Sequence, residues 1–153
     1  MIRYVLAVLL TVALAVLSVP AIDHAATVST ERQLQGDLAS VDDTAVSLYE
    51  NEEVTPDGVP APKRTVAVTF PADSLTSTSV EYVRIERLHE TGSLATFAAR
   101  ERGERHRLID APIVYADPHR NETVELGGSG ETRPLTLTLE RDDRGEPVVV
   151  ASQ

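Results

Sequence analysis

A long uncharged run near the start of the chain constrains its fold more than any other feature. Residues 4–22, YVLAVLLTVALAVLSVPAI, contain no charged side chain, and Thr11 and Ser18 are the strongly polar ones. As a helix this run extends about 28 Å, since each residue adds 1.5 Å, and a bilayer's hydrocarbon core is about 30 Å thick. The run therefore predicts a transmembrane segment at residues 1–22.

The charges that flank the run predict its orientation. Arg3 precedes it, whereas Asp23 and Glu31 are the first acidic residues after it. Positively charged residues favour the cytoplasmic side of a membrane helix. This pattern predicts a single-pass protein of the cell membrane, with a cytoplasmic amino terminus and an extracellular carboxy-terminal domain.

Residues 23–52 predict a continuation of the same helix. Apolar side chains recur at spacings of four, three, four and three residues, which forms one stripe of an amphipathic helix: Leu34, Leu38, Val41, Ala45 and Leu48. Residues 25–28, AATV, contain no helix breaker, and we expect Pro20 to kink the helix without ending it. One helix should therefore extend from about residue 2 to about residue 52.

The same opening is also compatible with an export signal. A short basic start, an apolar run and the small-residue sequence SVPA fit cleavage near Ala21. The alternative function is then an exported, β-rich domain that binds a ligand or a surface after release. The unbroken amphipathic continuation favours the uncleaved helix.

The remainder of the chain predicts a linker and a β-rich domain. Residues 53–64 contain Pro56, Gly58, Pro60 and Pro62, which forbid further helix. Residues 65–153 alternate apolar and polar side chains in seven or eight short runs separated by turn residues, which indicates an antiparallel sheet or small sandwich. We predict an α+β fold in which the long amino-terminal helix packs on an antiparallel β-meander.

The charge balance excludes one class of partner. The chain has 24 acidic residues against 14 basic ones, of which only Lys63 is a lysine, and its net charge is −10. This acidic, arginine-rich composition resembles proteins of salt-loving archaea, although a GC-rich genome also favours arginine over lysine. A surface of this charge does not favour nucleic acid, because binding phosphates needs a basic face.

No motif predicts catalysis. The chain has no cysteine, and its four histidines lack the spacing and company of a zinc site: His24, His89, His106 and His119. Residues 128–131, GSGE, and 142–146, DDRGE, predict turns and not a phosphate or calcium loop. We therefore expect no enzyme activity, no catalytic or metal site, no cofactor and no small-molecule substrate.

Two surface features remain as candidate sites. Asn121-Glu-Thr123 is an N-glycosylation sequon on a polar loop, which matters only for a domain outside the cell. The run RERGERHR predicts a hairpin whose arginines form either a solvated strand pair or a docking edge for an acidic partner: Arg100, Arg102, Arg105 and Arg107.

The organisation as a whole resembles type IV pilins and pseudopilins. The shared features are a long helix that is first apolar and then amphipathic, a proline near the join, and a following β-meander. The sequences RYVLAVLL and DHAATV, with the acidic composition, also resemble an uncharacterised haloarchaeal family associated with secretion- or pilus-type ATPase systems. The resemblance implies a membrane-anchored, non-enzymatic subunit with protein partners in a pilus-like or secretion-like assembly. Residues 4–22 lack the acid that pilins often place there, so we expect an accessory subunit and not a polymerising one.

Overall fold

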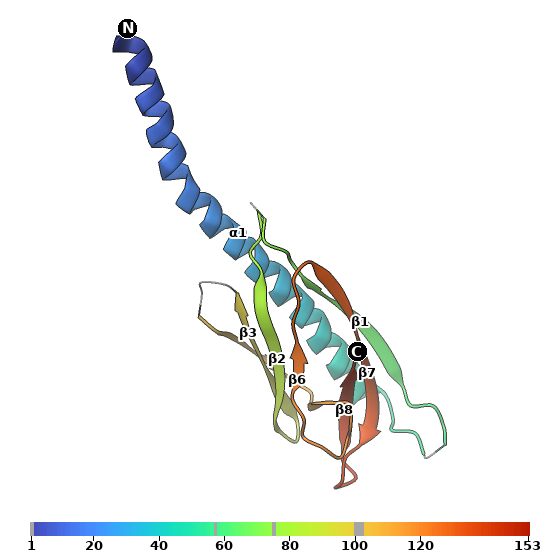
Figure 1. Ribbon diagram of the computed structural model, residues 1–153. Helices are drawn as coiled ribbons and strands as arrows, with labels where there is room; N and C mark the ends of the chain where they lie inside the picture. Colours follow the sequence, from blue (N-terminus) through green and yellow to red (C-terminus); the bar gives the residue numbers. More distant parts are fainter. Residues whose placement is uncertain (1, 57, 75, 100–102) are drawn as a thin grey trace.

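One unbroken helix forms the start of the chain in the computed structural model. The structure describes residues 2–56, 58–74, 76–99 and 103–153, and for residues 17–20 and 22 it describes the backbone alone. Helix α1 spans Ile2–Asn51 and continues through positions 20 and 36, which hold a proline and a glycine. The predicted helix from about residue 2 to about residue 52 is therefore confirmed (Figure 1).

Eight strands follow among the described residues, and they form two sheets. Their bounds are β1 Lys63–Phe70, β2 Val80–His89, β3 Gly92–Ala99, β4 Arg105–Ile109, β5 Ile113–Tyr115, β6 Val124–Leu126, β7 Glu131–Arg141 and β8 Pro147–Ser152. One sheet has the order β1-β7-β8-β5 and the other β4-β3-β2-β6. The predicted α+β class with mainly antiparallel sheets is confirmed.

The predicted simple meander is wrong in two respects. Strand β1 pairs with β7, far away in the sequence, and β5 pairs with β8 in parallel. The period of two fixes which side chains face the core, and it does so correctly for Val66, Val68 and Phe70, which are 9%, 0% and 0% exposed. It does not fix which strands become neighbours.

The second half of α1 packs on both sheets. All five residues of the predicted apolar stripe, from Leu34 to Leu48, are completely buried. They belong to one core cluster with residues of both sheets, and α1 contacts β1, β7 and β8 of one sheet and β3 and β4 of the other. The prediction that this stripe packs against the strands is confirmed.

Acidic residues beside the stripe bind the open edges of the sheets. The Asp37 carboxylate accepts a hydrogen bond from the backbone N–H of Thr69 on edge strand β1, at 2.8 Å. The Asp42 carboxylate accepts one from the backbone N–H of Asp110, at 3.3 Å, just after edge strand β4. Each contact satisfies one backbone N–H at or next to an open edge, where an unpaired N–H could otherwise bind another chain.

The helix leaves the β-rich part of the molecule near residue 26. Ala26 is 4% exposed, and the Thr30 hydroxyl donates to the carbonyl of Thr78 at 3.0 Å and accepts from its N–H at 2.9 Å. Before this point α1 projects away from the strands, as the blue end of the ribbon in Figure 1 shows. We call residues 2–25 the stem and residues 26–153 the head.

The prediction of a transmembrane segment at residues 1–22 is wrong. Among the described residues, no helix combines the length and the apolar character needed to cross a membrane. The same finding contradicts the predicted location, which was a single-pass protein of the cell membrane with a cytoplasmic amino terminus and an extracellular domain.

Candidate functional site

The stem exposes an unusually large amount of apolar surface. Ten large apolar side chains are 55–79% exposed, and these are Ile2, Tyr4, Val5, Leu6, Val8, Leu9, Leu10, Val12, Leu14 and Val16. Contiguous apolar surface of this kind on a protein marks an interaction site. The stem is therefore the strongest candidate for a functional surface.

This apolar surface surrounds the stem on every side. Residues 4–6 and residues 8–10 are runs of consecutive large apolar side chains, and successive residues of a helix point about 100° apart. The Thr11 hydroxyl donates to the carbonyl of Ala7 at 2.9 Å, so it is satisfied within the helix. A single apolar face would need one partner, whereas a helix that is apolar all round needs neighbours on several sides.

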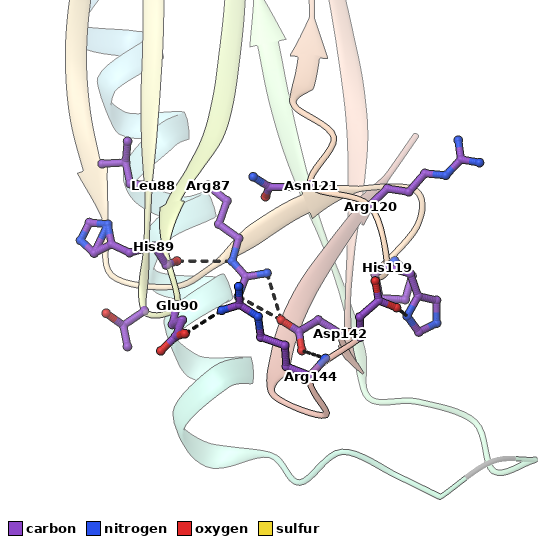
Figure 2. A pocket seen from close by; sticks show the side chains of 12 residues that line it. Arg87, Leu88, His89, Glu90, His119, Arg120, Asn121, Asp142 and Arg144 are labelled. Atoms are coloured by element: carbon purple, nitrogen blue, oxygen red, sulfur yellow. Dashed lines mark hydrogen bonds and ion pairs between the residues drawn. The ribbon is translucent and has the colours of Figure 1, made fainter.

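A second candidate is an open basin at the end of the head away from the stem. It has a volume of about 640 Å³ and is lined by three segments: residues 87–91 at the β2–β3 turn, residues 118–121, and residues 142–144 at the β7–β8 turn. Figure 2 shows charged side chains from all three segments around it. The predicted turn at residues 142–146 is confirmed, because the N–H of Asp142 donates to the carbonyl of Glu146 at 2.9 Å.

A shielded ion pair closes the floor of this basin. Both terminal nitrogens of Arg87 donate to the same carboxylate oxygen of Asp142 at 3.2 Å, and these side chains are only 13% and 8% exposed. The other oxygen of Asp142 accepts from the N–H groups of Arg144 and Glu146. Burial by itself would raise the pKa of Asp142, but these two backbone hydrogen bonds and the Arg87 guanidinium together lower it from 3.8.

The rim of the basin consists of paired charges. Arg144 binds Glu90 at 2.8 Å, and the His119 imidazole lies 2.7 Å from the carboxylate of Asp143. Arg120, which lines the basin, binds Glu122 at 3.2 Å, and Glu122 lies outside the lining. Within the described part of the chain, no group of three or more histidine or acidic side chains is placed to hold a metal ion. The basin thus presents neutralised pairs and not a cluster of ligands.

Of the predicted sites, Asn121 lies on the basin and is exposed to solvent (Figure 2). The glycosylation of this residue stays a prediction. Arg100 and Arg102 lie outside the described residues. Arg105 and Arg107 lie on β4 and point to the helix, where Arg105 is 3.8 Å from Glu31 and Arg107 is 3.2 Å from Asp42.

Arg105 and Arg107 thus already have acidic partners within the chain, and the docking edge for an acidic partner stays a prediction. The structure also keeps the predicted sites apart, since Arg105 and Arg107 contact α1 whereas Asn121 belongs to the basin. Near the arginine hairpin the Tyr82 hydroxyl donates to Glu104, and this hydrogen bond, with burial and the negative charge of Glu104, raises the pKa of Tyr82.

The shielded pair of Arg87 and Asp142 was not predicted from the sequence. One signal for it was present: Val83 and Ile85 are buried, so the strand's alternation places Arg87 on the same inward face. An arginine at an inward position needs an acidic partner. The partner itself lies on a distant turn, and no local pattern identifies it.

Comparison with known proteins gives one match. A family model described as "Domain of unknown function (DUF7311)" matches residues 1–153. The chain belongs to this family. No curated protein and no solved structure matches the chain. The family therefore extends over both the stem and the head.

Proposed function

We propose that this chain is a non-enzymatic subunit of a larger protein assembly, and that the stem joins it to apolar helices of partner subunits. The observation that carries the proposal is the exposure of ten large apolar side chains on the first part of a helix whose second half buries its apolar stripe in the head. In this arrangement the stem enters a bundle of helices, and the head remains outside the bundle.

The energy available for such an association is considerable. Burying one large aliphatic or aromatic side chain contributes about 1.5–3 kcal/mol, so covering the stem would release on the order of 10 kcal/mol before the entropic costs of association. Between Arg3 and Asp23 the stem offers little that a polar ligand could bind, because residues 4–22 carry no charge and the Thr11 hydroxyl is satisfied internally. The partner is therefore expected to present apolar helices.

The type of assembly is proposed from the architecture. A long helix with a free apolar first half and a second half packed on a β-rich head is the arrangement on which pilin-like subunits rely. This supports a pilus-like or secretion-like assembly, with the chain as an accessory subunit. The pairing of charges around the basin supports a non-enzymatic role, because Arg87, His119 and Arg144 each already contact an acidic side chain.

The test compares two double variants of the full chain in the cells that produce it. Leu6→Gln with Leu10→Gln makes the stem polar, and Leu88→Gln with Leu108→Gln makes the same change at the exposed leucines of the head, which are 46% and 65% exposed. We expect the stem variant to lose the native complex, as measured by native electrophoresis and by cross-linking mass spectrometry that maps contacts to residues 2–16. The head variant should keep it.

Complexes of unchanged size and unchanged stem cross-links in the Leu6/Leu10 variant would contradict the proposal. So would cross-links that connect the stem only to polar loops of other proteins.

A further inference from the structure

Charge is confined to the two ends of the stem. Arg3 lies at its tip and Asp23 at its base, both exposed, and residues 4–22 between them carry no charge. With His24 neutral, the stem has a net charge of zero, so the whole net charge of −10 belongs to the head. Apolar side chains alone do not determine whether a neighbouring helix packs parallel or antiparallel to the stem. The charges at the two ends of the stem and the charge of the heads determine it.

These charges favour an antiparallel neighbour. Two parallel stems would place Arg3 beside Arg3 and Asp23 beside Asp23, and would bring two acidic heads side by side. Two antiparallel stems place the tip of each beside the base of the other, oppose the helix dipoles, and separate the heads to opposite ends. Among copies of this chain, electrostatics therefore selects the antiparallel arrangement.

The length of the stem fits this arrangement. Contacts between α1 and the rest of the head begin at Ala26 and Thr30, which are 4% and 1% exposed. When residue 3 of one copy is level with residue 23 of the next, the two stems overlap over their full length and stop short of the heads. Because each stem is apolar on all sides, several stems alternate in direction to cover one another, as in antiparallel four-helix bundles.

We infer that free copies of this chain, before they join a larger assembly, cover their stems in an antiparallel bundle with second copies of the same chain. The inference rests on the proposed function, since it assumes that the stem packs against helices. It adds the identity of the partner in the free state and the direction of packing. An antiparallel bundle also keeps the apolar stem out of water until other subunits replace the copies.

Distances between labelled copies test the direction of packing. The chain has no cysteine, so Ile2→Cys and, separately, Ala13→Cys in the full-length protein each give one site for a spin label. In the antiparallel bundle residue 2 is level with residue 24 of its neighbour, so pulsed electron paramagnetic resonance should show a tip-to-tip component near ~33 Å. Parallel stems would give only short tip distances, about 10–20 Å. The central Ala13 label is close to its neighbour in both cases and reports association itself.

Charge reversal tests the contribution of the stem ends. We expect Arg3→Glu to raise the dissociation constant of the purified full chain by about two- to fivefold at low salt, with the effect fading at about 1 M salt. Adding Asp23→Arg to that variant should restore association, because the opposite charges then meet again. Arg32→Glu makes the same charge change at an exposed position of the head and should leave the dissociation constant unchanged.

Tip labels that give only short distances would overturn the antiparallel arrangement. A chain that stays monomeric at all concentrations, or that binds phosphatidylcholine vesicles without binding copies of itself, would overturn self-association. The proposed function is tested separately by the polar substitutions at Leu6 and Leu10. It stands if they abolish the native complex and fails if they do not, whatever the outcome for self-association.

Discussion

The two halves of α1 contain similar apolar side chains in opposite surroundings. Leu9 in the stem is 60% exposed, whereas Leu38 in the head is completely buried, although both belong to one continuous helix. The head half is amphipathic and meets two sheets that match its stripe, while the stem is apolar all round and projects away from the strands. Both halves are therefore helical, but only the second half is packed against the sheets.

The largest expected difference between the halves is in their contribution to stability. Leu38→Ala should lower the free energy of unfolding by about 3 kcal/mol, because it leaves a cavity between α1 and the sheets. Leu9→Ala should change it by less than about 0.5 kcal/mol, since its side chain is exposed. Urea denaturation followed by circular dichroism, at concentrations low enough to avoid association, measures both. Equal losses in the two variants would show that the stem is buried within the chain after all.

A similar contrast between shielded and exposed groups applies to the ion pairs at the far end of the head. Asp142→Ala should lower the free energy of unfolding by about 2–3 kcal/mol, because it strands the shielded Arg87 without its partner. Asp143→Ala, whose side chain is 71% exposed, serves as the control and should have an effect below about 0.5 kcal/mol. Equal effects of the two substitutions, measured by urea denaturation, would argue against the shielding of the Arg87 pair.

The Asp142 contribution should also depend on pH. Since its pKa is lowered in the folded state, its contribution to stability is present above pH 3.8 and is lost as the pH falls through the lower folded value. The wild type should therefore be no more stable than the Asp142→Ala variant once the pH is below the pKa of Asp142 in the folded state. Thermal unfolding at successive pH values measures this difference. A difference that persists unchanged in strong acid would exclude ionisation of Asp142 as its source.

Polar contacts made by the part of α1 that lies in the head should contribute less to stability than its leucines. Asp37→Ala removes the acceptor for the Thr69 N–H on edge strand β1, and we expect a loss of about 1–2 kcal/mol in the free energy of unfolding. Asp43→Ala, at an exposed position of the same helix, is the control. Hydrogen exchange should show faster exchange of the Thr69 amide in the first variant alone, and an unchanged rate would argue against this contact.

The smallest expected effect concerns the helix itself. Gly36 lies in the part of α1 that belongs to the head, and a Cβ added there meets no atom within 4 Å. Gly36→Ala should therefore raise the free energy of unfolding by about 0.5–1 kcal/mol through helix propensity alone. A decrease in thermal stability would indicate that this position is crowded by a contact which the isolated chain does not contain.

Local periodicity explains what could be predicted from the sequence. The stripe from Leu34 to Leu48 and the inward positions of the strands follow from spacing within one element, and these were confirmed. The pairing of β1 with β7, the edge contacts of Asp37 and Asp42, and the bond from Arg87 to Asp142 join distant segments, so no local pattern contains them. The membrane prediction rested on the length of an uncharged run, and no helix among the described residues is long and apolar enough to cross a membrane.

The continuity of α1 from stem to head has a mechanical consequence. No linker separates the tip of the helix from the stripe that packs against the two sheets. A pull on the tip is therefore transmitted along the helix axis and loads all the buried turns at once, in shear, instead of peeling them off one by one. A structure of this kind resists traction far better than the same contacts would resist unzipping, so the head can bear load without a covalent cross-link.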